Sequence, residues 1–389
     1  MTVPVERVLE QIIGTMQFVQ RPTARATYGS VSWCLWLLGL HPNPFVSQQQ
    51  TPESRVVVRR YGGRMYDRFA VSVQAEPRDR KSWIDLARRL ESAGYDALLA
   101  PDHLGSGASP FVALAAAAAV TDRIGVGSCV SQAGIRNPLM LASDVATLDV
   151  VSDGRARLGL GAGHTPIEWA MLGECRPGVD DRVARFIEVA HACRRLLDGQ
   201  TVTVDSEYLR LVNASLTQPR RCQQHVPLTV GTSNIAMLEW AARNADVVSM
   251  TGFGRTLADG HSHVVRWSDG HIDQQVNVID YHAETSRNVV TKDALVQFVE
   301  VTADAEAAAN RLGETHGVNP GDLLTSPYAW LGTVDEIVDG ILRNRARWGI
   351  SRYTIREQHL DAVDAIRIRW ESLPSVAAAG GRRKSVDGC

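Results

Sequence analysis

The stretch Asp149-Val-Val-Ser-Asp-Gly-Arg-Ala-Arg-Leu-Gly-Leu-Gly-Ala-Gly163 decides the fold of this chain. Its pattern predicts a helix that ends near Val151, a turn over residues 152–154 and a short strand over residues 156–160. Three small residues follow the strand: Gly161, Ala162 and Gly163. Glycine has no side chain to keep a phosphate or a flat ring away from the main-chain N–H groups. The stretch therefore predicts helix, turn, strand and an exit that a ligand can approach.

The same alternation of strand and helix continues along the chain from about residue 68. Apolar segments of strand length alternate with segments whose apolar residues recur at helical spacing. We expect eight strands, over residues 69–73, 97–100, 124–130, 156–160, 227–230, 246–250, 295–301 and 351–356. Such a pattern most simply closes as an α/β fold of the (β/α)8 TIM barrel class with insertions.

Two insertions and one alternative fold complete this prediction. Residues 201–212 predict a surface hairpin, and the polar segment over residues 251–292 predicts an active-site lid with helical pieces. A doubly wound sheet is the alternative, but no Gly-x-Gly-x-x-Gly follows the first strand. Chemistry in a barrel lies at the C-terminal ends of the strands, so the residues that follow each strand are the candidate site.

Composition restricts the class of partner. The chain has 389 residues, and 41 basic against 43 acidic residues give a net charge of −2. This charge provides no field to attract nucleic acid or an anionic membrane, so we expect a small-molecule partner. The six cysteines include no Cys-x-x-Cys pair, which indicates a reducing cytoplasm.

The chain divides into one barrel and two flanking segments. Residues 1–66 predict a poorly ordered N-terminal extension, residues 67–374 the barrel, and residues 375–389 a flexible tail. Residues 31–40 are apolar like the centre of a signal peptide, but they are too short to span a bilayer and no small-x-small cleavage site follows. We therefore expect no membrane anchor.

Three strand exits have side chains that suit catalysis or binding. His103, after Asp102, titrates near neutral pH and can exchange a proton or hold a cofactor oxygen, although an isolated Asp-His pair is more often a helix cap with a solvated histidine. Gly231, Thr232 and Ser233 precede a helix and can cradle a phosphate, unless Ser233 is an ordinary N-cap. Gly161 to Gly163 form the third exit, and they suit either a ligand or a tight turn.

Other candidates receive a structural interpretation. No cationic residue near Cys129 in the sequence would lower its thiol pKa, so it is expected to be a small barrel residue. His261, His263 and His271 could suggest zinc, but no cysteine or carboxylate completes a recognisable spacing. A solvated face of the lid is the expected role of these histidines, and no metal site is predicted.

From about residue 68 to 370 the chain resembles the luciferase-like monooxygenase superfamily, barrels that use FMN or the deazaflavin coenzyme F420. The matching stretches are Glu91-Ser-Ala-Gly-Tyr-Asp96, Pro101-Asp-His103, Val126-Gly-Ser-Cys-Val130, Arg136-Asn-Pro138, Ala146-Thr-Leu-Asp149, Ser152-Asp-Gly-Arg155, Leu158-Gly-Leu-Gly-Ala-Gly163 and Gly332-Thr-Val-Asp-Glu336. Their order and spacing agree with that family. The resemblance implies a luciferase-like barrel.

The resemblance also implies roles for single residues. It brings Asp102 and His103 close to the cofactor ring and makes residues 128–130 the support behind that ring, often with a non-prolyl cis peptide. It implies the following cofactor-binding residues: Asp102, His103, Ser128, Cys129, Val130, Gly161, Ala162, Gly163, Gly231, Thr232 and Ser233. Some deazaflavin dehydrogenases have a glutamate and an asparagine where this chain has His164 and Ile167. This departure speaks against sugar-phosphate dehydrogenase chemistry.

The resemblance implies an oxidoreductase that transfers hydride between coenzyme F420 and a small organic substrate, with His103 and then His164 as proton donor or acceptor. The protein would supply orientation and a dry pocket, and the cofactor the redox chemistry. One alternative is an FMN-dependent monooxygenase supplied by a separate reductase. A second is a catalytically silent cofactor-binding barrel. The alanine run over residues 115–119 and the resemblance together suggest a homodimer.

Overall fold

The computed structural model describes residues 69–257 and 263–373. The predicted extension over residues 1–66, the predicted tail over residues 375–389 and His261 lie outside the described residues. The predicted domain boundaries therefore stay predictions.

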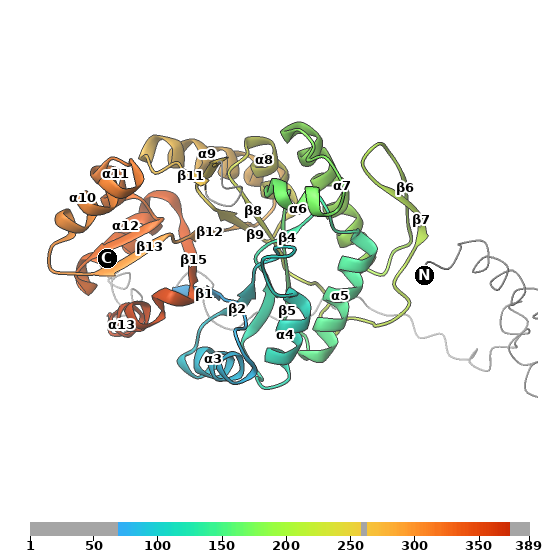
Figure 1. The fold of residues 1–389 in the computed structure, drawn as a ribbon, viewed down its shortest axis with the longest axis horizontal. Coiled ribbons are helices and arrows are strands. Elements are labelled where there is room, and N and C mark those ends of the chain that lie inside the picture. The colour runs from blue at the N-terminus through green and yellow to red at the C-terminus, as the bar shows by residue number, and fades with distance from the viewer. Residues whose placement is uncertain (1–68, 258–262, 374–389) are drawn as a thin grey trace, which may run out of the picture. The chain divides into compact units, whose positions relative to one another are not determined.

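Eight parallel strands form a closed barrel in the described chain (Figure 1). Neighbouring strands follow the order β3, β2, β1, β15, β12, β9, β8 and β5, and pairing of β3 with β5 closes the ring. The strands are β1 (Ala70–Gln74), β2 (Ala97–Ala100), β3 (Gly125–Ser128), β5 (Ala156–Gly161), β8 (Leu228–Thr232), β9 (Val247–Met250), β12 (Thr291–Leu295) and β15 (Ile350–Arg356). The predicted (β/α)8 TIM barrel is confirmed, and the doubly wound alternative is wrong because that sheet would keep two open edges.

Helices pack around this barrel, and local sequence explains their ends. The main helices are α3 (Arg80–Ala93), α4 (Pro110–Ala118), α5 (Pro138–Val151), α7 (Val179–Leu197), α8 (Ile235–Asn244), α9 (Asp269–Ser286), α12 (Val334–Trp348) and α13 (Leu360–Glu371). Asp79 caps α3 by accepting from Ser82 N at 2.9 Å, and Gly94 ends it in the left-handed region that glycine adopts freely. The Thr333 capping box predicted for α12 is present. These signals are local, which is why the sequence located the helices well.

The prediction of the seventh strand is wrong. The barrel strand is β12, and only Leu295 of the predicted segment belongs to it. The strand is polar in sequence because Asp293 points into the barrel, where Ser249 Oγ donates to its carboxylate at 2.5 Å and Thr354 Oγ1 at 3.2 Å. Burial raises the pKa of Asp293 against these hydrogen bonds. Because the strand contains this buried carboxylate, its sequence lacks the apolar pattern from which a strand is predicted.

The remaining predicted residues belong to an insertion. β13 (Phe298–Val301) pairs in parallel with β14 (Ala329–Gly332) in a separate two-stranded sheet. Helices α10 (Ala305–His316) and α11 (Pro320–Thr325) lie beside it, at the left in Figure 1. The predicted surface hairpin is confirmed as β6 (Val202–Asp205) with β7 (Arg210–Ala214).

The predicted lid is smaller than the sequence suggested. β10 (Phe253–Thr256) and β11 (His263–Val265) form an antiparallel hairpin, but α9 is an ordinary barrel helix that packs against α8. Of the predicted lid segment, only the β10–β11 hairpin is therefore an insertion after β9. Short elements also join the barrel at β4 (Ser131–Gln132), α6 (Pro166–Met171) and a 3-10 turn, Glu357–His359.

The N-terminal end of the barrel holds charges that are paired with one another. Arg157 Nη1 lies 2.5 Å from Asp96 Oδ2, and Arg352 donates to the same carboxylate. Burial raises the pKa of Asp96, but the two arginine charges outweigh it and hold that pKa well below its usual range. This cluster joins β5 and β15 to the start of β2.

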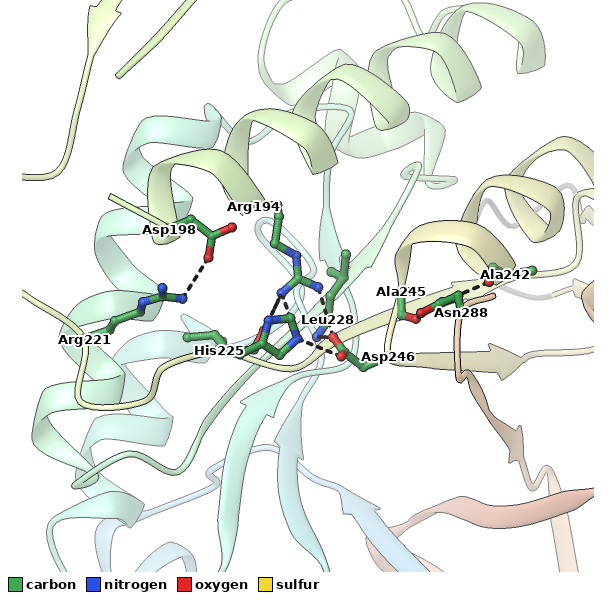
Figure 2. Close-up of polar contacts among 10 residues, drawn as sticks. Arg194, Asp198, Arg221, His225, Leu228, Ala242, Ala245, Asp246 and Asn288 are labelled. Carbon is green, nitrogen blue, oxygen red and sulfur yellow. Dashed lines mark hydrogen bonds and ion pairs between the residues drawn. The ribbon is translucent and has the colours of Figure 1, made fainter. Parts of the chain in front are cut away.

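A second cluster ties the starts of β8 and β9 to α7 (Figure 2). His225 Nε2 lies 2.7 Å from Asp246 Oδ1, and Arg194 Nη2 donates to Asp246 Oδ2 at 3.0 Å. Leu228 N donates to the same carboxylate oxygen at 2.7 Å. Charge pairs and main-chain groups satisfy each other here, so this end serves stability.

The stretch Asp149 to Arg155, one of the stretches that carry the family resemblance, also stabilises the N-terminal end of the barrel. Asp149 accepts from the N–H groups of Cys222 and Gln223 at 2.6 and 3.0 Å. Arg155 donates to main-chain carbonyls of Ile124, Thr121, Ala118 and Ser152. The turn before β5 therefore stabilises the fold. Only the glycines at the C-terminal end of β5 reach the candidate site.

Candidate functional site

The C-terminal ends of the barrel strands, called the barrel mouth below, bring the predicted site residues together. The mouth comprises the exits over residues 102–103, 128–134, 161–165, 232–234 and 251–253. His103 and His164 have ring centroids 5.6 Å apart, although 61 positions separate them in sequence. The two predicted catalytic histidines are therefore neighbours.

His103 is held by a carboxylate that sequence reasoning missed. Its Nδ1 lies 2.8 Å from Oε1 of Glu168, and the Glu168 side chain is fully buried. The hydrogen bond that His103 donates to Glu168 raises the pKa of His103, whereas burial lowers it. The other ring nitrogen, Nε2, has no hydrogen-bond partner among the described residues. His103 thus has one nitrogen fixed by protein and one available to a ligand.

Gln132 and Arg136 fix the exit of β2. Gln132 Nε2 donates to Asp102 O at 2.6 Å and also to Glu168 Oε2. Arg136 donates two hydrogen bonds to the Asp102 carboxylate, from Nε to Oδ2 at 2.7 Å and from Nη2 to Oδ1 at 2.6 Å. Both Asp102 oxygens are therefore occupied by protein, so Asp102 acts as a positioning residue. Its direct contact with a cofactor stays a prediction.

His164 lies in a stack of rings at the mouth. Its ring centroid is 4.4 Å from that of His263, which stacks on Phe253 at 4.3 Å with an interplanar angle of 7°. Burial, then the charges of His263, His103, Arg176 and Arg182, lower the pKa of His164 to about 3. His164 is therefore neutral at neutral pH, and His263 is a ring in this stack rather than part of a solvated face.

The exit of β3 is fixed by hydrogen bonds within the barrel, and the assignment of Ser128, Cys129 and Val130 to cofactor binding stays a prediction. The peptide between Cys129 and Val130 is cis, at the position that the resemblance implied. Ser128 Oγ donates to Gly159 O at 2.9 Å, and Gln74 Nε2 donates to Cys129 O at 2.6 Å. Burial, then the Asp293 charge, raises the pKa of Cys129 to about 12, so its thiol stays protonated.

Val130 explains two of the glycines. A Cβ on Gly161 would lie 2.7 Å from Val130 Cγ2, and one on Gly231 would lie 3.0 Å from Val130 Cγ1. Both glycines thus make room for Val130. Their assignment as cofactor-binding residues, with Ala162 and Gly163, stays a prediction that rests on their main-chain groups.

The start of α8 retains the features of a phosphate cradle. The N-cap is Asn234 rather than Ser233, and its side chain accepts from Met237 N at 3.1 Å. Thr232 Oγ1 accepts from Asn234 N, while Ser233 Oγ lies 3.1 Å from Thr251 Oγ1. The N–H groups of Ile235 and Ala236 keep no acceptor among residues that the structure describes. A helix N-terminus with free N–H groups favours an anion.

Several buried polar atoms near the exits lack partners, which tests whether a cofactor fits. Within the described chain, Ser131 Oγ, Gln132 Oε1 and Thr165 Oγ1 have no hydrogen bond. Thr165 and Ser131 are fully buried. Such atoms are costly to leave unsatisfied, and a ligand with several hydrogen-bonding groups can satisfy them. The residues of the mouth therefore fit a polar cofactor.

Sequence reasoning missed Glu168, Gln132, Arg176 and Arg182. Glu168 lies in the first turn of the six-residue helix α6, which is too short to give a periodic signal. Gln132 follows β3 in a two-residue strand. Proline at the start of α6 was the one available signal of a helix.

Comparisons with known proteins agree with this geometry. Two curated relatives are named F420-dependent glucose-6-phosphate dehydrogenase: one from Beutenbergia cavernae, 34% identical over 48% of this chain and 57% of that protein, and one from Intrasporangium calvum, 28% identical over 56% and 64%. The matches thus span little more than half the length of these relatives.

Two solved structures share the fold. They are the coenzyme F420 dependent tetrahydromethanopterin reductase from Methanopyrus kandleri (TM-score 0.61, 19% identity, 78% of this chain and 98% of that one) and an F420-dependent secondary alcohol dehydrogenase in complex with an F420-acetone adduct (TM-score 0.62, 19% identity, 79% and 99%). At this identity they show the fold alone.

No helix within residues 69–257 and 263–373 combines the length and apolar character needed to cross a bilayer. A profile of luciferase-like monooxygenases matches residues 65–367, most of the chain. Because this match covers most of the chain and the fold is a closed parallel barrel, the chain belongs to the luciferase-like monooxygenase family.

Proposed function

We propose that this protein is an oxidoreductase that transfers hydride between coenzyme F420 and a small organic substrate at the barrel mouth. The observation that carries the proposal is the pair of His103 and buried Glu168, which leaves Nε2 of His103 free at a strand exit. The names of the relatives support F420 as the cofactor. The bound deazaflavin would give or take the hydride.

His103 would exchange the proton that accompanies hydride transfer. Glu168 accepts from Nδ1–H, which fixes the tautomer with its basic nitrogen at Nε2. Glu168 also raises the pKa of His103, which favours the protonated form that can donate a proton. An alcohol can then lose its proton to Nε2, or a carbonyl oxygen can receive one from it.

The rings of His164, His263 and Phe253 would keep water from this atom. They stack from the exit of β5 to the β10–β11 hairpin, and His164 borders His103. Neutral His164 can hold a substrate oxygen without adding charge. Exclusion of water strengthens hydrogen bonds at the mouth.

Main-chain groups would hold the cofactor. The exit over residues 161–163 and the free N–H groups at the start of α8 suit a polar chain that ends in phosphate. The unsatisfied oxygens of Ser131 and Gln132 suit the edge of a ring with both donors and acceptors.

Equilibrium titration tests the cofactor first. Fluorescence or absorbance would follow binding of F420, and separately of oxidised and reduced FMN, to purified protein. Selective F420 binding is expected. Selective binding of reduced FMN would instead support the monooxygenase alternative with a partner reductase, and binding of neither would favour the silent barrel. The homodimer, the reductase and the cytoplasmic location stay predictions.

A further inference from the structure

Arg182 is a buried cation with no counter-ion among residues 69–257 and 263–373. It lies in the first turn of α7 with 7% of its surface exposed, and its Nε and Nη1 have no hydrogen-bond partner within the described chain. Nε of Arg176, in the loop before α7, is likewise buried and unpartnered. Two partly buried arginines differ, because Arg136 forms an ion pair with Asp102 and Arg157 forms one with Asp96.

The acidic neighbours of Arg182 do not neutralise it. Asp181 is exposed and accepts from Tyr208 Oη at 3.1 Å. Glu174 and Asp180 are exposed, and neither forms an ion pair among residues 69–257 and 263–373. Among the described residues, neither Arg176 nor Arg182 forms an ion pair with a carboxylate, and the charge of Arg176 acts on Arg182.

Electrostatics support this description. Burial, then the charge of Arg176, lowers the pKa of Arg182 to about 10, and burial lowers that of Arg176. Both side chains stay protonated at neutral pH, and both contribute to the low pKa of His164. The Arg176–Arg182 pair is therefore close enough to His164 to act on its charge.

Leaving buried charges unpaired is unfavourable, and functional sites are where such arrangements occur. A guanidinium offers several donors in one plane, which match the oxygens of phosphate or carboxylate. His164 connects the pair to His103, whose ring centroid lies 5.6 Å from its own. An anion held by the pair would thus be next to the proposed catalytic group.

We propose that Arg182, together with Arg176 from the loop before α7, binds a phosphate or carboxylate group at the N-terminal end of α7. The site stands on its own, and only the source of the anion rests on the proposed function. One source is the organic substrate, which would then be an anionic compound. The other is the tail of F420, which has a phosphodiester and carboxylates beyond its ribityl chain.

Calorimetric titration with inorganic phosphate at low salt tests the site without any redox reaction. Arg182→Gln and the double variant Arg176→Gln/Arg182→Gln are expected to weaken phosphate binding about tenfold or more. Arg195→Gln is the matched control, because Arg195 is exposed on the same helix and has the same charge. Equal phosphate affinity in wild type and double variant, or an equal loss in the control, would overturn the proposal.

Thermal unfolding separates binding from folding. Phosphate should raise the Tm of the wild type and of Arg195→Gln more than that of the double variant, which retains only the N–H groups at the start of α8. Without phosphate, Arg182→Gln should keep or raise the Tm, whereas a structural arginine would lower it. Arg182→Lys retains the charge and should retain part of the phosphate response, which keeps the test open if the glutamine variant does not fold.

Titration with F420 and with its core lacking the phosphate and glutamate tail identifies the source. If the tail is the anion, the double variant loses affinity for F420 and not for the core. If the substrate is the anion, both affinities stay at the wild-type value while phosphate binding falls. Failure of F420 to bind at all would remove the proposed function and leave the anion site standing.

Discussion

The two ends of the barrel differ in how fully their charges are paired. At the N-terminal end, Asp96 joins Arg157 and Arg352, and His225 lies between Arg194 and Asp246 (Figure 2). At the mouth, Arg136 is paired with Asp102, but Arg182 is buried with no carboxylate partner in the described part of the chain, and the His103 nitrogen Nε2 is open. Charges that are paired within the protein hold the strands together, whereas unpaired groups are available to bind a ligand. The difference teaches which end serves stability and which serves a ligand.

Two histidines give the largest expected contrast. His103→Asn should lower kcat by about 10²- to 10⁴-fold with the substrate that F420 reduction identifies, because Nε2 is lost as proton donor or acceptor. His225→Asn, at the opposite end, should leave kcat within about twofold of the wild type. Steady-state kinetics checks both. Equal kcat in His103→Asn and wild type, with F420 still bound, would contradict the acid–base role.

Stability should respond most strongly at the N-terminal end. Asp96→Asn should lower the free energy of unfolding by about 3 kcal/mol, because Arg157 and Arg352 then keep their charges without a carboxylate. Asp361→Asn, which breaks the exposed pair with Arg89, should cost less than about 1 kcal/mol. Urea denaturation followed by circular dichroism measures both. Similar losses would show that burial does not distinguish the pairs.

Glu168→Gln should change the pH profile of turnover more than its maximum. The hydrogen bond to Glu168 raises the pKa of His103, so its loss should move the limb that reports His103 to lower pH. The matching contribution to stability is present below pH 6.5 and is lost as pH rises through the folded pKa. The measurement is kcat/KM as a function of pH in the wild type and in Glu168→Gln. If both profiles rise and fall at the same pH values, Glu168 has no positioning role.

A pH effect on stability, confined to the acid range, is expected from His164. Its folded pKa of about 3 lies below the ordinary 6.5, so the unfolded state binds the extra proton and stability falls as pH drops from 6.5 towards 3. One such group contributes at most about 1.4 kcal/mol per pH unit. His164→Gln should therefore flatten the acid side of the stability curve relative to wild type. Phosphate should flatten it as well, because a bound anion opposes the arginine charges that act on His164.

Local signals in the sequence determined most of the fold. Periodic apolar residues, Gly94 at a helix end and the Thr333 capping box each act over a few residues, so they located elements without tertiary information. The rule that barrel chemistry lies at strand exits then selected His103 and His164, which the structure brings together. Their catalytic roles remain to be measured.

Tertiary structure alone decided the rest. Asp293 lies on a barrel strand because Ser249 and Thr354 from two other strands donate to it, and no local pattern contains those partners. Gly161 and Gly231 are glycine because Val130, in the loop after β3, fills their space. Glu168 meets His103 across 65 positions, and Arg182 has no ion pair within the described residues, where neighbouring Asp181 accepts from Tyr208 instead. Sequence fixes which groups are present and their local conformation, but pairing and burial depend on contacts between distant segments.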